Sequence, residues 1–323
     1  MRQINNIQSQ PNRSQSDHHL THGPSHQHSR PSKLRKHMLR WVYSNAYLAF
    51  PILAITFETY MYIGDFNISI NYLGFMFFST LFLYPFHRLI GIYSTPELEY
   101  TKAQREVSKR PNLTRISVIL GFMGALYFAP QLPFEIISWL LPLGLISLAY
   151  SIPFIPTTSG WKRLRDIPGL KIFAITIVVT MTTSTIPLQF SGTVSDLNIW
   201  FFDVQRFLFI LAITIPFDVR DAHLDKKWNL KTIPLLIGKK NAILLSIILL
   251  YSSFAVHVIQ YYSTQIFTIE IVFATLLAIV FTHYLIHDFK NKNTYLYNAF
   301  LIEGAMVYHT SIITITMILI DLV

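Results

Sequence analysis

Residues 215–238 read IPFDVRDAHLDKKWNLKTIPLLIG and follow directly on a long apolar segment. The stretch contains Asp218, Asp221 and Asp225, spaced three and four residues apart, in a chain that has only 17 acidic residues. If the preceding helix continues through the stretch, the three carboxylates lie on one helix face, within about 60° of one another. They also lie at the negative end of the helix dipole, so their mutual repulsion requires a positive partner.

A hard divalent cation suits such a cluster best. Mg²⁺ typically takes one or two carboxylates together with phosphate oxygens of a substrate, so we expect Asp218, Asp221 and Asp225 to hold Mg²⁺. The choice of Mg²⁺ over Ca²⁺ follows only if the substrate is phosphorylated. The alternative is an acidic patch at the membrane interface, neutralised by the neighbouring Lys226 and Lys227.

The composition is typical of a polytopic membrane protein built from helices. The 323 residues are 52% hydrophobic and 13% charged, with a mean hydropathy of +0.40, whereas soluble domains are about 25% charged. Apolar runs of about 20 residues, long enough to cross a bilayer, recur from Trp41 onward. We predict an all-α membrane bundle with nine transmembrane helices, near 41–63, 70–92, 114–130, 133–155, 170–188, 199–217, 241–260, 266–286 and 297–320.

The basic residues predict how this bundle is oriented. All lysines and arginines except Arg206 fall in five groups, one before the first predicted span and the others in alternate loops. The positive-inside rule places these groups in the cytoplasm, with the N-terminus inside and the C-terminus outside. We expect an integral protein of a bacterial-type cytoplasmic (inner) membrane, surrounded by membrane lipids. The net charge of +9 therefore reflects topology rather than nucleic-acid binding, and the absence of cysteine excludes disulfides and thiol chemistry.

Residues 1–40 differ in composition from the membrane domain predicted for 41–323. They are rich in His, Ser, Gln and Pro and lack an apolar period, which predicts a disordered cytoplasmic tail. The histidines of this tail are interpreted either as transition-metal ligands or, preferably, as incidental residues of a solvated segment.

The acidic stretch and its continuation resemble the second aspartate-rich motif of the UbiA-type intramembrane prenyltransferases. In that family a Lys-Thr-Ile/Leu-Pro…Gly tail often follows the motif, and here it is present as Lys231-Thr232-Ile233-Pro234 and Gly238. The segment YSIPFIPTTSGWKRLRDIPGLK at 150–171 is also similar, with Tyr150, Pro153 and Lys171 at the positions of many relatives. The resemblance covers about residues 41–320.

The resemblance implies a fold and an activity. In the family, two aspartate-rich clusters face each other across a cavity near the cytoplasm and bind Mg²⁺ and a polyprenyl diphosphate. Ionisation of the diphosphate gives an allylic cation, which a lipophilic, often aromatic, acceptor captures. By this resemblance Asp218, Asp221 and Asp225 are both catalytic and metal-binding. Arg110, Tyr150 and Lys171 are assigned to the substrate, and Lys171 is interpreted either as a ligand of the diphosphate or as a basic anchor at the membrane interface. His87 is added because an ionisable residue next to Arg88 at membrane depth is usually functional.

The first cluster departs from the family pattern. Counting back from Arg110-Pro111 leads to YSTPELEYT at 93–101, where Glu97 is the residue that keeps a carboxylate, as a residual metal or water ligand. Arg88, near the inner end of the second span, is interpreted either as a catalytic ligand of the diphosphate or as an interfacial arginine that extends to the membrane surface.

Three functional hypotheses therefore remain. The first is a Mg²⁺-dependent membrane prenyltransferase, and the second is a non-catalytic UbiA-like protein that binds isoprenoid lipids. The third, a cation-coupled transporter, is less favoured because the acidic residues gather on one cytoplasmic face rather than at mid-membrane. Glu303 in the last span is interpreted either as a base on the acceptor side or as a polar helix contact. His257, His283 and His309 are expected to be satisfied bundle contacts.

Overall fold

The computed structural model describes residues 47, 49–63, 69–93, 100, 102–109, 111–157, 160–167, 169–228, 230–289 and 302–322. The predicted tail 1–40 lies outside the described residues, and so do two of the predicted site residues, Glu97 and Arg110. Their assignments remain predictions.

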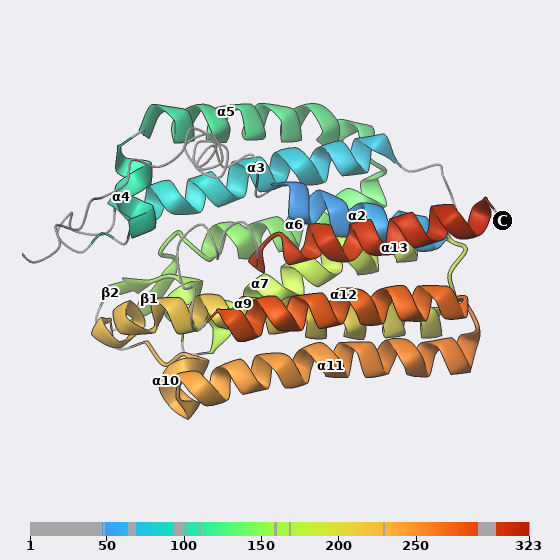
Figure 1. Cartoon of the computed structure of the whole chain (residues 1–323). Helices are drawn as coiled ribbons and strands as arrows, with labels where there is room; N and C mark the ends of the chain where they lie inside the picture. The colour runs from blue at the N-terminus through green and yellow to red at the C-terminus, as the bar shows by residue number, and fades with distance from the viewer. Residues whose placement is uncertain are drawn as a thin grey trace, which may run out of the picture.

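The described chain folds into a bundle of roughly antiparallel helices with one small hairpin (Figure 1). Its long or apolar helices are α2 (Ala49–Ile63), α3 (Ile70–Tyr93), α5 (Pro111–Phe128), α6 (Phe134–Ala149), α7 (Leu170–Thr180), α8 (Ile186–Ser191), α9 (Asp196–Lys227), α11 (Lys239–Thr264), α12 (Ile269–Asp288) and α13 (Ala305–Asp321). Two short helices, α4 (Lys102–Ser108) and α10 (Ile233–Ile237), and the antiparallel strands β1 (Ile155–Thr157) and β2 (Gly160–Lys162) lie in the connections. A π-helical segment, Met181–Thr185, joins α7 to α8.

The helices agree with an integral membrane protein. Among the described residues, six helical segments are long and apolar enough to cross a bilayer: 70–93, 111–131, 170–191, 196–227, 239–264 and 269–288. Three shorter apolar helices, 49–63, 134–149 and 305–320, lie where the other three spans were predicted. The all-α membrane bundle is therefore confirmed, while the count of nine transmembrane helices stays a prediction.

The predicted span 133–155 ends earlier than expected. Helix α6 stops at Ala149, and the chain turns at Tyr150–Ile152 into the hairpin of β1 and β2. Pro153 and Pro156 explain the difference, because proline lacks a backbone N–H and disfavours the helical conformation of the residue before it.

Helix α9 is longer than the span predicted at 199–217. It begins after the Ser195 cap, whose hydroxyl accepts a hydrogen bond from the Asn198 backbone N–H, and continues without interruption to Lys227. Because the helix runs through the acidic stretch, Asp218, Asp221 and Asp225 lie on its last three turns, on one face, as expected for a helix that continues.

Helices α3 and α5 cross at very short range. A Cβ atom built on Gly121 would lie 2.6 Å from the carbonyl carbon of Leu81, and one on Gly124 would overlap the ring of Phe78. Glycine is required at Gly121 because the contact is with backbone, which cannot move aside as a side chain can. This crossing fixes the wall that α3 and α5 give to the cavity described below.

The connections rich in Lys and Arg gather at one end of the bundle. Helix α4, the β1–β2 hairpin and α10 all lie at the left end in Figure 1, away from the C-terminus. This arrangement agrees with the alternation of basic loops in the sequence. The identity of the membrane and the side of it on which this end lies remain predictions.

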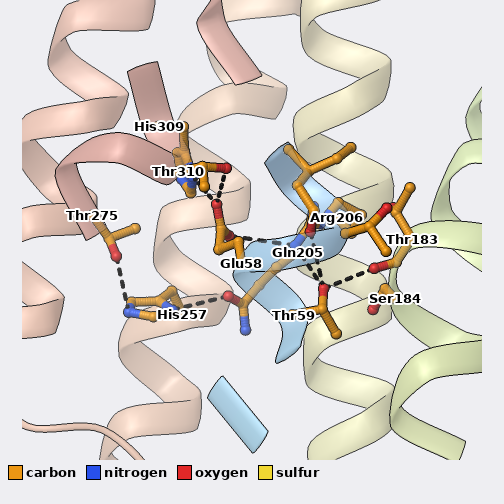
Figure 2. A network of polar contacts seen from close by, with 12 residues as sticks. Glu58, Thr59, Thr183, Ser184, Gln205, Arg206, His257, Thr275, His309 and Thr310 are labelled. Atoms are coloured by element: carbon orange, nitrogen blue, oxygen red, sulfur yellow. Dashed lines mark hydrogen bonds and ion pairs between the residues drawn. The ribbon is translucent and has the colours of Figure 1, made fainter. Parts of the chain in front are cut away.

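A buried polar network joins the helices toward the opposite end. The Glu58 carboxylate of α2 accepts hydrogen bonds from Thr310 (2.8 Å) and contacts Arg206 Nη2 (3.3 Å) and His309 Nδ1 (3.0 Å), as Figure 2 shows. His257 bonds Gln205 at 2.9 Å through Nδ1 and Thr275 at 3.3 Å through Nε2. His283 Nδ1 bonds the Tyr251 hydroxyl at 2.9 Å. The prediction that His257, His283 and His309 are satisfied bundle contacts is confirmed.

Candidate active-site cavity

A large cavity opens between α3, α5, α6, α7, α9 and α13. Its volume is about 720 Å³. At one end its wall carries charged and polar side chains from the C-terminal part of α9, the start of α7 and the inner end of α3. The rest of the wall is mainly apolar and includes Phe75, Met76, Phe82, Phe122, Leu140 and Leu143. The cavity therefore combines a site for a charged group with a chamber for a hydrocarbon chain.

The cavity brings together the predicted site residues that the structure describes. The side chains in its wall include His87, Arg88, Tyr150, Lys171, Asp218, Asp221 and Asp225. They come from α3, from the residue after α6, from α7 and from α9, so segments up to 138 positions apart (87 to 225) meet at one end of the bundle. Their chemical roles stay predictions.

Lys171 is the positive partner of two of the three aspartates. Gly169, in the left-handed conformation at φ +76°, precedes α7 and places Lys171 in its first turn. The Lys171 Nζ lies 2.8 Å from Asp218 Oδ1 and 3.5 Å from Asp225 Oδ2. These carboxylates are almost fully buried, at 3% and 2% exposure. Burial strengthens the attraction, because the local dielectric is lower than that of water.

Arg220 is the partner of the third aspartate. Its Nε and Nη2 contact the two oxygens of Asp221 at 2.8 and 3.0 Å, which is the bidentate geometry of strong arginine–carboxylate pairs. Lys171 and Arg220 therefore neutralise the carboxylates from within the protein. Lys226 and Lys227 are exposed, and neutralisation of the cluster by these two lysines stays a prediction.

The aspartates have the ligand chemistry of a Mg²⁺ site but not its arrangement. Three carboxylates on one helix face supply the hard oxygen ligands that Mg²⁺ prefers, and all three line the cavity. The part of the chain that the structure describes contains no group of three His, Cys, Asp or Glu side chains arranged to hold a metal. A cation at this end therefore competes with Lys171 and Arg220 for the same carboxylates.

His87, Tyr150 and Arg165 line the cavity together with the aspartates. The rings of His87 and Tyr150 lie 5.5 Å apart between centroids, and Arg165 Cζ lies 5.8 Å from the centre of the Tyr150 ring. His87 Nδ1 and Arg165 Nε are buried and have no hydrogen-bond partner among the described residues. Buried polar atoms are almost always satisfied, so both atoms point to a ligand or to water in the cavity.

A local salt bridge holds Arg165 in this position. Arg163 and Asp166 cap the single helical turn 164–166, with Arg163 Nε 2.9 Å from Asp166 Oδ2. Partial burial alone would raise the pKa of Asp166, but the hydrogen bonds from Arg163 outweigh it and hold that pKa below its usual range. Asp166 is therefore ionised at neutral pH, and the turn that carries Arg165 is fixed.

Three solved structures have an overall fold similar to that of this chain. A digeranylgeranylglyceryl phosphate synthase is 14% identical with a TM-score of 0.53, over 88% of this chain and 98% of its own. An apo UbiA homologue from Aeropyrum pernix K1 is 14% identical with a TM-score of 0.54, over 88% and 99%. A UbiA homologue from Archaeoglobus fulgidus, bound to GPP and Mg²⁺, is 15% identical with a TM-score of 0.52, over 86% and 98%.

This chain has the UbiA-type prenyltransferase fold. The matches cover nearly the full length of the solved structures, so the likeness is to the whole domain and not to a few helices. No family model matches the sequence, and no curated protein sequence is similar to it. The predicted resemblance is therefore confirmed at the level of the fold.

Within this UbiA-type bundle the sequence failed to single out several cavity residues. Arg165 is one of several basic residues in the 162–171 segment, and Arg220 lies between two of the motif's aspartates without being part of the predicted site. Tyr84 and Gln104 carry no charge and belong to no motif, yet both line the cavity. The one available signal was for Arg220, because an arginine next to an aspartate forms a bidentate pair without help from the rest of the fold.

Proposed function

We propose that this protein is an integral-membrane prenyltransferase. It transfers an isoprenyl group from a polyprenyl diphosphate to a lipophilic, often aromatic, acceptor in a Mg²⁺-dependent reaction. The proposal includes a bacterial-type cytoplasmic membrane, with the charged end of the cavity on the cytoplasmic side. The observation that carries it is the cavity itself, in which charged side chains and a long apolar wall enclose one continuous space.

The diphosphate group binds at the charged end. Lys171, Arg165 and His87 present donors there, and two of their nitrogens lack partners among the described residues. Arginine suits this role because its planar group matches the oxygens of a phosphate. Arg88 lines the same end from α3 and adds a further positive charge.

The carboxylates Asp218, Asp221 and Asp225 would hold Mg²⁺ beside the diphosphate. Bound there, Mg²⁺ supplies stabilisation of the negative charge that develops on the leaving diphosphate. Lys171 pairs with Asp218 and Arg220 pairs with Asp221, so positive charge stands directly beside these carboxylates.

The isoprenyl chain occupies the apolar part of the cavity. The wall extends from Lys171 along α7 into the π-helical segment at Thr182, which is a rise of about 16 Å along the helix axis. Apolar helices exclude water from this space, so a cation formed near the charged end meets the acceptor rather than water. Aromatic faces such as those of Phe82 and Phe122 favour a nearby positive charge.

The second candidate is an isoprenoid-binding protein without catalysis. The ion pairs of Lys171 and Arg220 with the aspartates favour it, because they satisfy the carboxylates without a metal. The degenerate first motif, in which Glu97 keeps the carboxylate, favours it as well.

One experiment separates the two candidates. Purified protein in lipid nanodiscs is incubated with labelled prenyl diphosphates, Mg²⁺ and a membrane lipid extract, and both pyrophosphate and labelled lipids are measured. Prenyl transfer predicts equal amounts of pyrophosphate and labelled lipid, and no product in EDTA. Donor that binds to the protein but is recovered unchanged supports the binding-only candidate.

A further inference from the structure

Glu303 is a half-buried residue of the cavity wall with one buried carboxyl oxygen, and the proposed diphosphate and metal sites leave it unused. It lies in the turn just before α13, and it lines the cavity together with Tyr84, Arg88 and Arg220. The aspartates of α9 are bound to Lys171 and Arg220, whereas Glu303 has no salt bridge within 4 Å among the described residues. From the sequence alone, Glu303 was interpreted either as a base on the acceptor side or as a polar helix contact.

The hydrogen bonds around Glu303 satisfy only part of its carboxyl group. Arg88 Nη2 donates a hydrogen bond of 2.9 Å to the Tyr84 hydroxyl, and the Tyr84 hydroxyl bonds the Glu303 carboxyl. Oε2 of Glu303 is buried and has no hydrogen-bond partner among the described residues. A buried carboxyl oxygen is rarely left without a donor, so a ligand that carries a hydrogen-bond donor completes this arrangement.

The surroundings of Glu303 restrict the chemical class of the ligand that donates this hydrogen bond. Arg88 and Arg220 line the cavity together with Glu303. The oxygens of the Glu303 carboxyl and of a diphosphate are both hydrogen-bond acceptors, so the donor's leaving group belongs beside the nitrogen donors of Lys171 and Arg165. A neutral molecule with a dissociable proton is attracted to Glu303. Within the proposed reaction, the acceptor has this property.

We propose that Glu303 binds the acceptor through its dissociable proton and takes that proton as the prenyl group is transferred. The proposal rests on the proposed prenyltransferase function and names the acceptor side of the same cavity. It predicts an acceptor whose reacting atom is a hydroxyl oxygen or an aromatic carbon activated by a hydroxyl. Tyr84 and Arg88 are positioning residues, because they hold the carboxyl group in place.

The step balances as follows. The bond between C1 of the prenyl group and the diphosphate oxygen breaks, and its electron pair leaves with the diphosphate. The acceptor's reacting atom forms a new bond to C1. Its proton moves to Glu303 and from there to water at the open, charged end. The products are the prenylated acceptor, pyrophosphate and one proton, and no oxidant or reductant is needed.

The test compares Glu303→Gln with Glu303→Asp and with the control Glu135→Gln, which changes an exposed glutamate in the first turn of α6. A positioned general base contributes about 10²- to 10⁴-fold to a rate. We expect Glu303→Gln to lower kcat for transfer by at least about 100-fold, while the Kd of the prenyl diphosphate and the slow release of pyrophosphate by water stay at wild-type values. Glu303→Asp should restore part of kcat, and Glu135→Gln should match the wild type.

Other outcomes would overturn the proposal. Wild-type kcat in Glu303→Gln shows that no proton passes to this carboxyl, and an equal loss of donor binding and transfer shows a structural or diphosphate-binding role. If Glu303→Gln fails to fold, Tyr84→Phe takes its place, with an expected loss of kcat at unchanged donor Kd. A wild-type protein that transfers no prenyl group to any acceptor contradicts the proposed function instead, so the two failures are distinguishable.

Discussion

Replacement of Lys171 by methionine tests how the buried aspartates are stabilised. Lys171→Met keeps the length of the side chain and removes its charge, which leaves Asp218 and Asp225 without their shared partner. At an effective dielectric of about 20, the attraction is about 6 kcal/mol for the 2.8 Å contact and about 5 kcal/mol for the 3.5 Å contact. Much of this attraction is offset by the cost of desolvating the charges. Loss of one partner from a buried pair typically destabilises a protein by about 3–5 kcal/mol.

We therefore expect Lys171→Met to lower the midpoint of thermal unfolding clearly when EDTA is present. Because Mg²⁺ can replace the lost positive charge between the carboxylates, added Mg²⁺ should restore part of the stability. The same Mg²⁺ should have a smaller effect on the wild type, in which Lys171 occupies the carboxylates. The assay is thermal unfolding followed by intrinsic fluorescence in detergent, over a range of Mg²⁺ concentrations.

The matched control is Lys240→Met, at an exposed position in the first turn of α11. It should unfold as the wild type does in both conditions. If Lys171→Met is as stable as the control, the two contacts of Lys171 do not stabilise the fold. If it is unstable but indifferent to Mg²⁺, the aspartates do not form a cation site, and the competition between Lys171 and Mg²⁺ is refuted.

Three further predictions concern other parts of the bundle. Arg165→Gln should raise the Kd of a prenyl diphosphate about tenfold or more, because a charge-assisted hydrogen bond contributes about 1.5–3 kcal/mol. An unchanged Kd in a binding titration would show that Arg165 does not bind the diphosphate. Glu58→Gln should destabilise the fold by about 3–5 kcal/mol, because it leaves the buried Arg206 without its carboxylate partner. A free energy of unfolding equal to that of the wild type, measured by chemical denaturation, would contradict the network in Figure 2. Gly121→Ala should lower the free energy of unfolding by about 1–3 kcal/mol, because the added methyl group overpacks the crossing of α3 and α5. The control Gly144→Ala, with nothing within 4 Å of the added Cβ, should be neutral. Equal unfolding midpoints of the two variants would show that α3 and α5 do not cross this closely.

The sequence predicted the fold well where it contained periodic or repeated signals. Apolar runs placed the helices, and the spacing of the aspartates on α9 predicted their common face. The acidic motif with its Lys-Thr-Ile-Pro tail predicted the UbiA-type fold, which three solved structures support. Such features are local, so they can be recognised from a single chain.

The partners of the aspartates could not be predicted in the same way. Lys171 is 47 residues from Asp218 in the chain, and only the packing of α7 against α9 brings their charges within 2.8 Å. The unsatisfied Oε2 of Glu303 likewise depends on how α13 begins relative to α3. The β1–β2 hairpin was missed because its strands have only three residues each, too few for a period to be visible.

The most direct test of the prenyltransferase account is a single-turnover measurement with labelled prenyl diphosphate in nanodiscs that contain the wild type or Asp221→Asn. The account predicts Mg²⁺-dependent release of pyrophosphate from the wild type, matched by label in a lipid product, and neither from Asp221→Asn. If the wild type and Asp221→Asn release pyrophosphate at the same rate, or if neither converts bound donor in Mg²⁺, the assignment of the aspartate-lined cavity as a catalytic site is contradicted.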